Sequence, residues 1–201
     1  MTDITTRKNM LRRQAKAYRI SLDKDKKAEF DKKISNKLQN LWQYRESNVI
    51  LIYMSSDIEV STRTVIERAL ADGKRVFLPR CTDADNQLEF FEIKDFSSLE
   101  KRAFNLLEPI YDEGKKLRDF NEGLCVVPAL LFDRRGYRIG YGKGYYDSFL
   151  SSFGGLTVGL CYDENLMDTV PYNDRDIKVR TVLTQSETVN TCEGRECFEQ
   201  Q

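Results

Sequence analysis

The sequence predicts a single α/β domain with a largely parallel sheet. Short apolar runs alternate with stretches that have the 3.6-residue period of amphipathic helices. The length of 201 residues suits one domain, and a composition of 40% hydrophobic and 32% charged residues suits a sizeable core under a charged surface. In such a sheet we expect right-handed crossovers, with ligands at the carboxyl ends of the strands.

The first elements are two helices followed by a buried strand. Thr5–Ile20 is predicted as a helix and Leu22–Trp42 as a second one. The second has one apolar face, formed at helical spacing by Phe30, Ile34, Leu38 and Leu41. Val49–Met54 is a continuous apolar run, which is typical of a strand covered on both faces.

The next unit is a helix and a strand. Thr62–Asp72 is predicted as a helix that begins at a Ser61 or Thr62 cap and ends at Gly73. The strand Arg75–Leu78 follows and is expected to end at Pro79.

The rest of the chain continues the alternation. Ser97–Gly123 is expected to be mostly loop and turn, and residues 188–201 a polar, flexible tail after a domain spanning 1–187. The remaining predicted strands are Leu88–Ile93, Leu124–Val127, Thr157–Cys161 and Thr181–Thr184, with a helix over Gly144–Phe153.

Composition excludes several classes of chemistry. The chain has no histidine, so Ser-His-Asp and Cys-His catalysis and His-ligated zinc are excluded.

The net charge is zero, but residues 1–45 carry 13 Lys or Arg against 5 Asp or Glu. This basic flank fits either ordinary solvated helix faces or a surface turned toward an anionic ligand. No nucleic-acid recognition motif is visible, so we expect no nucleic-acid partner.

The cysteines and the apolar runs bear on localisation. None of the five cysteines forms a Cys-x-x-Cys pair, and Cys125 and Cys161 lie in apolar runs, as reduced buried thiols do. No apolar run approaches the roughly 20 residues of a membrane span, and the first ten residues are polar. We therefore expect a cytoplasmic protein without a signal peptide or membrane partner.

The most distinctive segment is a glycine loop between a predicted strand and a predicted helix. Gly136, Gly140, Gly142 and Gly144 fall within nine residues, interleaved with Arg138 and Lys143. Glycines there let backbone N–H groups face a ligand, and a helix N-terminus adds partial positive charge, so the loop suits phosphates. The pattern is neither a Walker A motif nor the dinucleotide fingerprint, and a tight turn packed with tyrosines is the alternative.

Asp147 is a candidate for holding a metal-bound phosphate. It follows the glycine loop in the opening turn of the predicted helix, and a second loop with carboxylates, Asp174 and Asp176, precedes the last strand. Mg²⁺ in phosphate sites takes one or two carboxylates together with phosphate oxygens. Compensation of the helix dipole by Asp147 and plain turn roles for Asp174 and Asp176 are the alternatives, and the second loop alone decides nothing.

Four segments together resemble the 5-formyltetrahydrofolate cyclo-ligase family. They are Lys8–Arg12, Glu59–Thr62, the glycine loop with its Tyr145-Tyr146-Asp147 ending, and Asn173–Val179. The resemblance implies a three-layer α/β domain similar to the CoA-transferase and sugar-phosphate-isomerase group. It also implies ATP-dependent closure of 5-formyltetrahydrofolate to 5,10-methenyltetrahydrofolate, with small-molecule substrates and Mg²⁺. We expect a monomer, although no feature of the sequence specifies the oligomeric state.

The resemblance also implies roles for single residues. Lys143, Arg138 and Tyr145 are the expected catalytic residues, Met54, Glu59, Tyr141, Lys143 and Tyr145 the folate contacts, and Asp147 and Asp176 the Mg²⁺ ligands. ATP contacts are implied for Lys8, Arg12, Arg138, Gly140, Gly142, Lys143, Gly144, Tyr145 and Tyr146. One departure is Arg175, where many relatives have His or Asn.

Two other functions remain open at the level of sequence. A sensor domain on a similar fold would bind a nucleotide or sugar phosphate without turnover. A sugar-phosphate isomerase would need a positioned general base and no ATP. ATP-dependent turnover separates the three.

Overall fold

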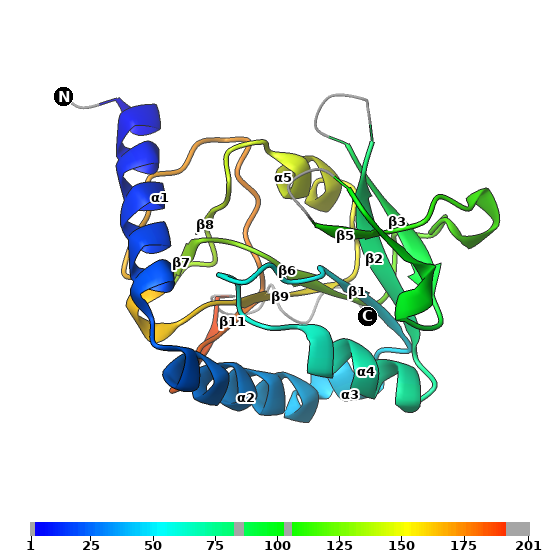
Figure 1. Ribbon diagram of the computed structural model, residues 1–201. Coiled ribbons are helices and arrows are strands. Elements are labelled where there is room, and N and C mark those ends of the chain that lie inside the picture. Colours follow the sequence, from blue (N-terminus) through cyan, green and yellow to red (C-terminus); the bar gives the residue numbers. More distant parts are fainter. Residues whose placement is uncertain (1–2, 83–86, 103–105, 192–201) are drawn as a thin grey trace.

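A mostly parallel sheet runs through the middle of the protein (Figure 1). The computed structural model describes residues 3–82, 87–102 and 106–191. In spatial order the strands are β12 (Thr188–Asn190), β11 (Thr181–Leu183), β9 (Leu156–Leu160), β6 (Leu124–Val127), β1 (Val49–Ile52), β2 (Arg75–Cys81) and β3 (Leu88–Ile93). The pairs from β11 to β2 are parallel, and the edge strands β12 and β3 are antiparallel to their neighbours. The predicted α/β class is confirmed.

Helices cover both faces of the sheet. Figure 1 shows α2 (Lys24–Asn40), α3 (Trp42–Glu46) and α4 (Arg63–Ala71) on one face and α5 (Tyr145–Leu150) on the other. Successive strand residues point to opposite faces. Ile50 and Ile52 accordingly join the apolar cluster under α2 and α4, and Leu51 joins the cluster under α5.

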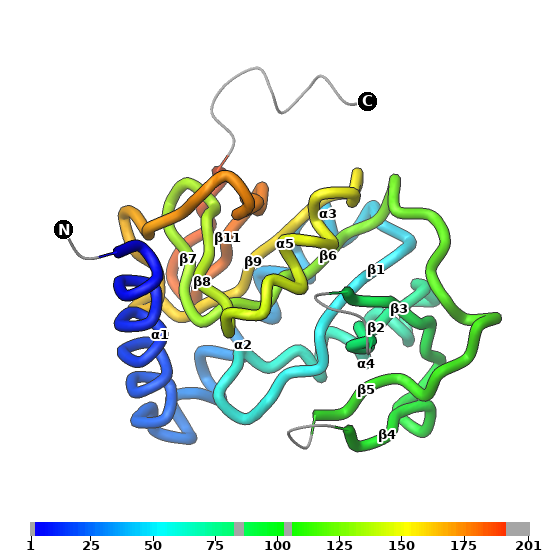
Figure 2. The backbone as a smooth tube through the Cα atoms, turned by 90° about the horizontal axis from the view of Figure 1, so that it is seen from above, coloured from blue at the N-terminus to red at the C-terminus, as the bar shows by residue number. Residues whose placement is uncertain are grey.

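The first helix, α1 (Ile4–Ser21), does not lie on the main sheet. It packs on a small sheet made of β10 (Leu166–Met167), β7 (Leu131–Asp133) and β8 (Arg138–Ile139). Figure 2 shows β7 and β8 between α1 and the main sheet. Buried Arg19 ties α1 to the end of β6 through Nη2, which donates to the carbonyls of Ala129 and Leu130, both at 2.7 Å.

Several boundaries differ from the sequence prediction. β2 continues through Pro79 to Cys81, because β1 pairs with β2 only as far as Phe77, so that Pro79 has β3 as its strand partner. The segment expected to be mostly loop contains a hairpin of β4 (Leu99–Lys101) and β5 (Leu107–Pro109). Short 3₁₀ turns span Phe96–Ser98, Glu113–Lys115 and Asp163–Asn165.

The first residues of the predicted tail belong to the main sheet. Thr188–Asn190 pair with β11 as an edge strand, so the sheet extends beyond residue 187. The rest of the predicted tail from 192, with Cys192 and Cys197, lies outside the described residues. Within the described part of the chain no helix has the length and apolar character that crossing a bilayer requires.

Candidate functional site

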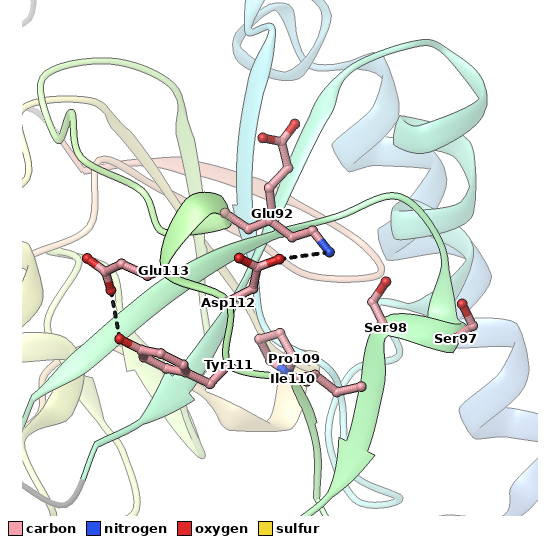
Figure 3. Close-up of a pocket in the computed structure, with 9 residues that line it drawn as sticks. Glu92, Ser97, Ser98, Pro109, Ile110, Tyr111, Asp112 and Glu113 are labelled. Carbon is pink, nitrogen blue, oxygen red and sulfur yellow. Dashed lines mark hydrogen bonds and ion pairs between the residues drawn. The ribbon is translucent and has the colours of Figure 1, made fainter.

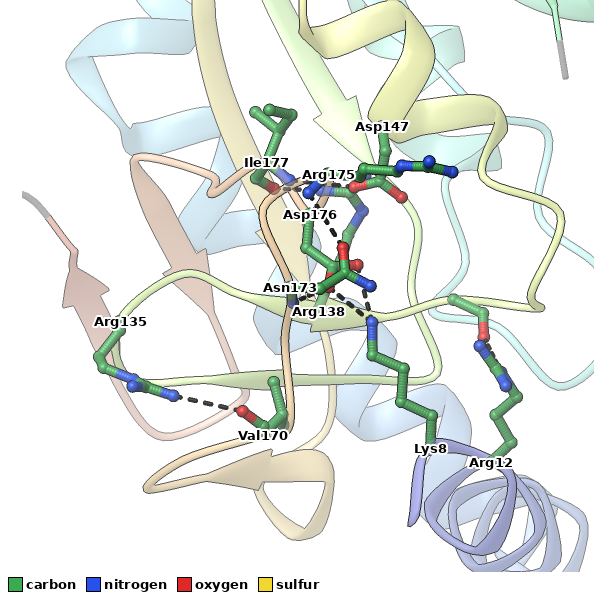
Figure 4. A network of polar contacts seen from close by, with 11 residues as sticks. Lys8, Arg12, Arg135, Arg138, Asp147, Val170, Asn173, Arg175, Asp176 and Ile177 are labelled. Atoms are coloured by element: carbon green, nitrogen blue, oxygen red, sulfur yellow. Dashed lines mark hydrogen bonds and ion pairs between the residues drawn. The ribbon is translucent and has the colours of Figure 1, made fainter. Parts of the chain in front are cut away.

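Two cations on one face of α1 reach two different loops. Lys8 and Arg12 are one turn apart, so their side chains point the same way. Lys8 Nζ lies 2.9 Å from Asp176 Oδ1 and 2.6 Å from Oδ2, and Arg12 Nε donates to the carbonyl of Gly140 at 2.9 Å (Figure 4). The helix face thereby joins the glycine loop to the segment before β11, 168 residues from Lys8.

The glycine loop after β8 has the conformation that its sequence predicts. Gly142 and Gly144 have φ values of 101° and 73°, which favour glycine, and a Cβ on Gly142 would lie 3.3 Å from Arg12 Cζ. Residues 141–144 donate no backbone hydrogen bond to any described residue. Exposed Lys143 has no polar contact within the described part of the chain either. Free amides and a free ammonium therefore line this loop.

The helix after the loop is shorter than predicted. α5 ends at Leu150 instead of Phe153, and its first turn holds Asp147. So short a helix has a small dipole, and anion binding at this loop rests on side-chain cations and loop amides.

Arg138 lies beneath the loop. The side chain is 4% exposed, and its guanidinium donates to Asp147 Oδ1 at 2.7 Å and to the Ile177 carbonyl at 2.5 Å. The Ile177 amide donates to the same Oδ1 at 3.1 Å. Burial lowers the pKa of Arg138, and Asp147 opposes that shift. Arg138 thus fixes Asp147 against the loop that carries Asp176.

Glu59 forms the other side of the site. It is buried, and its Oε2 accepts from the amide and the hydroxyl of Ser56, both at 2.8 Å. Its Oε1 accepts from the Tyr141 hydroxyl at 3.1 Å, while Tyr141 stays 45% exposed. Burial and the Glu59 carboxylate raise the pKa of Tyr141, so this hydroxyl remains a donor. Met54 lies partly buried between β1 and Glu59.

Side-chain hydrogen bonds fix both ends of the loop that carries Glu59. Thr62 begins α4, but its hydroxyl makes no helix cap; it donates to the Tyr53 carbonyl at 2.7 Å. The Tyr53 hydroxyl donates to the Val60 carbonyl at 3.1 Å. Tyr162 supports the loop from below, donating to Asp31 Oδ1 at 2.8 Å and lying 3.4 Å from the Glu59 carbonyl. These contacts hold Glu59 at the carboxyl end of β1.

The side chains of the two tyrosines after the loop, Tyr145 and Tyr146, lie in different environments. Tyr145 hydrogen bonds with the Cys81 thiol, which also contacts Glu108, so its side chain reaches toward the end of β2. The Tyr146 hydroxyl is buried without a hydrogen-bond partner among the described residues. Of the expected ATP contacts, Tyr146 is therefore turned into the core.

The structure thus brings most of the predicted residues to one edge of the sheet. Hydrogen bonds and ion pairs link α1, the glycine loop, Asp147, the loop of Asp176 and Glu59. Sequence reasoning missed Ser56, Arg19, Asp31 and Tyr162, and only Ser56, close to Glu59 in the same loop, carries a local signal. Arg175 is exposed and its side chain has no ion pair with a described residue.

A hollow in the described part of the chain lies away from these residues. It has a volume of about 550 Å³ and lies beside β3 and the β4–β5 hairpin (Figure 3). Its acids are already paired, Asp112 with Lys115 and Glu113 with the Tyr111 hydroxyl. None of the predicted site residues lines it.

Asp147 and Asp176 could hold a metal ion only together with oxygens from a bound ligand such as a phosphate. No group of three or more Asp, Glu, Cys or His that could hold an ion occurs among the described residues. Asp147 Oδ2 has no partner there, whereas both oxygens of Asp176 contact Lys8. Two carboxylates with phosphate oxygens is the arrangement that Mg²⁺ uses in nucleotide sites.

Comparison with known proteins gives the same family as the sequence motifs. The chain is 31% identical to the 5-formyltetrahydrofolate cyclo-ligase of Saccharomyces cerevisiae, over 88% of this chain and 94% of that protein. It is 30% identical to the mouse 5-formyltetrahydrofolate cyclo-ligase, over 70% and 75%. The solved 5,10-methenyltetrahydrofolate synthetase of Aquifex aeolicus superposes with a TM-score of 0.80 at 27% identity, over 94% of this chain and 95% of that one.

The match extends through nearly the whole described chain. A model of the 5-formyltetrahydrofolate cyclo-ligase family covers residues 4–185, which span α1 at one end and β11 at the other. The chain belongs to the 5-formyltetrahydrofolate cyclo-ligase family.

Proposed function

We propose that this protein closes 5-formyltetrahydrofolate to 5,10-methenyltetrahydrofolate and converts ATP to ADP and phosphate in doing so. Family membership supports the reaction. The position of the reaction site is inferred from the glycine loop, which contacts Arg12 on one side and Glu59 on the other. A loop between a cluster of cations and a buried carboxylate suits a reaction between a phosphate donor and a nitrogen-rich ring.

The nucleotide side comprises α1 and the glycine loop. Lys8, Arg12 and Lys143 are the cations that would contact the phosphates, and the loop amides of Gly140, Gly142 and Gly144 complete the cradle. Arg138 acts from beneath, because it is buried and already bound to Asp147. Tyr145 and Tyr146 would contribute through their backbone, because the Tyr145 side chain reaches Cys81 and the Tyr146 hydroxyl is buried.

The folate side comprises Met54, Glu59 and the face of Tyr141. An ionised carboxylate only accepts hydrogen bonds, which suits the N–H donors of a pterin ring. The half-exposed Tyr141 ring offers a flat surface beside Glu59. Lys143 of the loop and Tyr145, the first residue of α5, would complete the folate contacts.

Asp147 and Asp176 would hold Mg²⁺. The ion would neutralise phosphate charge and orient the terminal phosphate. The two carboxylates come from different segments, and Arg138 together with the Ile177 amide connects those segments.

The chemistry needs positioning more than proton relay. The N5-formyl oxygen attacks the terminal phosphorus of ATP and ADP leaves, giving an O-phosphorylated iminium. N10 then attacks the formyl carbon, loses its proton, and the formyl oxygen departs as phosphate. In-line alignment and charge neutralisation dominate such phosphoryl transfer, so a chain without histidine can catalyse it.

A cyclisation assay tests the proposal. The protein incubated with 5-formyltetrahydrofolate, Mg²⁺ and ATP should produce methenyltetrahydrofolate absorbance and an equal amount of ADP, and neither without ATP. Lys143→Ala should lower the rate. Absence of ATP-dependent product from wild type would overturn the proposal, and equal rates of an active wild type and the variant would show only that Lys143 is not needed.

Glu59→Gln separates the two halves of the site. We expect a KM for the folate raised about tenfold to a hundredfold with the KM for ATP little changed, since a buried charged hydrogen bond contributes about 1.5–3 kcal/mol. Equal effects on both KM values would place Glu59 outside the folate side.

The same family membership argues against the sensor and isomerase alternatives.

We also propose that the protein acts in the cytoplasm as a monomer. Sedimentation of the full chain tests the oligomeric state. Its buried Cys125 and Cys161 are free thiols, as a reducing compartment would keep them.

A further inference from the structure

Lys8 occupies the position at Asp176 that a metal cation would take. Its ammonium lies within 2.9 Å of both carboxylate oxygens, and the Asn173 amide takes a further place on Oδ2 at 2.7 Å. The two side chains are only 12% and 15% exposed, so water screens the pair weakly. Both oxygens of Asp176 are therefore already neutralised by the protein's own cation (Figure 4).

Asp147 is held differently. Its Oδ1 takes Arg138 and the Ile177 amide, while Oδ2 has no partner among the described residues. Arg138 is 4% exposed and also bound to the Ile177 carbonyl, so it stays where it is when a ligand arrives. One of the two carboxylates is open to a metal and the other is blocked.

We propose that Lys8 is an exchangeable counter-ion of Asp176, which leaves for the nucleotide phosphates and so makes metal binding depend on nucleotide. This inference rests on the proposed function only in taking Asp147 and Asp176 as the ligands and a nucleotide as the partner. Without phosphate, Mg²⁺ at Asp176 would meet the Lys8 ammonium, a like charge that already lies within 2.9 Å of both carboxylate oxygens.

The side chain of Lys8 suits this exchange. Lysine carries a compact charge on a flexible four-carbon stem, whereas a guanidinium in a forked contact is held rigidly. Lys8 and Arg12 share one helix face, and Arg12 contacts the glycine loop at Gly140. A phosphate bound at that loop therefore lies on the side of α1 toward which Lys8 already points.

The exchange predicts opposite effects of one substitution on two ligands. In Lys8→Met, Mn²⁺ used as the probe should bind the nucleotide-free protein about tenfold more tightly than it binds wild type, because a cation is removed from the metal carboxylate. The same variant should bind the nucleotide analogue AMP-PNP without metal about tenfold more weakly, since a phosphate contact is lost. Titration calorimetry measures the analogue, and electron paramagnetic resonance counts free Mn²⁺.

The matched control is Lys33→Met, which breaks a lysine–carboxylate pair of the same 2.6 Å length on the exposed face of α2. It should change neither affinity. Adding Asp176→Asn to Lys8→Met should abolish the gain in Mn²⁺ affinity, which places that gain at Asp176. Thermal melting of each variant checks that it is folded.

The outcomes are distinct. Tighter Mn²⁺ and weaker analogue binding support the exchange. Unchanged or weaker Mn²⁺ binding in Lys8→Met overturns it, and weakening of both ligands shows that Lys8 only holds the loop in place. The cyclisation assay on wild type is a separate result: activity with unchanged Mn²⁺ binding rejects the exchange alone, and absence of activity rejects the proposed function alone.

Discussion

Two buried tyrosine hydroxyls near the site have opposite surroundings. The Tyr146 hydroxyl has no hydrogen-bond partner among the described residues, whereas the Tyr162 hydroxyl donates to Asp31 at 2.8 Å. A buried polar group without a partner costs stability, and one with a charged acceptor contributes to it. The same substitution should therefore act with opposite sign at the two positions.

Tyr146→Phe should leave the free energy of unfolding unchanged or raise it by up to about 1 kcal/mol. Tyr162→Phe should lower it by about 1–3 kcal/mol, because the Asp31 carboxylate loses a buried donor. Urea unfolding of the two variants and wild type measures both. A loss of stability in Tyr146→Phe as large as in Tyr162→Phe would mean that the Tyr146 hydroxyl is satisfied.

The raised pKa of Cys81 makes the stability of the fold depend on pH in the alkaline range. Burial, and then the nearby Glu108 carboxylate, raise the pKa of the Cys81 thiol from 9.0 to about 11. Above pH 9 the unfolded chain releases this proton while the folded chain keeps it, so the unfolded state binds fewer protons and stability falls as pH rises from 9 to 11.

Cys81→Ser should remove this share of the alkaline loss. Between pH 9 and 11, wild type should lose up to about 2 kcal/mol more stability than the variant, while below pH 8 the two curves stay parallel. Chemical denaturation at a series of pH values measures the difference. Parallel curves across the whole range would contradict the raised pKa.

At the scale of the element, the glycine loop depends on backbone conformation at defined positions. Gly144 has φ of 73° and open space around its Cβ position, and Gly140 has the same open space without a positive φ. The two positions therefore differ in backbone strain and not in room for a methyl group.

Gly144→Ala should lower the free energy of unfolding by about 1–2 kcal/mol, the cost of a left-handed conformation for an L-residue. Gly140→Ala should change it by less than about 0.5 kcal/mol or raise it slightly. Thermal unfolding of both variants provides the comparison. Equal losses would show that something other than φ restricts the loop.

At the scale of the whole molecule, α1 is attached to the site by long-range contacts. Arg19 anchors its C-terminal end at the strand end of β6, while Lys8 and Arg12 contact the two loops that would enclose a nucleotide. A ligand bound between these parts links α1, the glycine loop and the loop of Asp176.

Mg²⁺ with AMP-PNP should raise the melting temperature and slow amide hydrogen exchange in α1 and in residues 173–177 together, because a ligand that binds only the folded state stabilises it. Hydrogen exchange followed by mass spectrometry tests this. The α4 helix, on the opposite face of the sheet from α5, serves as the internal reference. Protection of the glycine loop without α1 would contradict a role for Lys8 and Arg12 at the phosphates.

Much of the fold was predictable from local pattern. The run Leu124–Val127 forms a strand with those same ends, because a continuous apolar run in an α/β chain has one stable place, in the middle of the sheet. The short strands β7, β8 and β10 were missed, since two or three residues carry no period, and their apolar side chains pack against α1 residues distant in sequence.

The α/β class, the glycine loop and the residue types that suit phosphate and folate all follow from the order of residues along the chain. Glycine at positions 142 and 144 and carboxylates at 147 and 176 are local choices, readable from chain order and chemistry. The pairings of Lys8 with Asp176, Tyr141 with Glu59 and Tyr162 with Asp31 became visible only in the folded chain. Those contacts join residues 82 to 168 positions apart, and packing of the whole chain, not any local preference, brings them together.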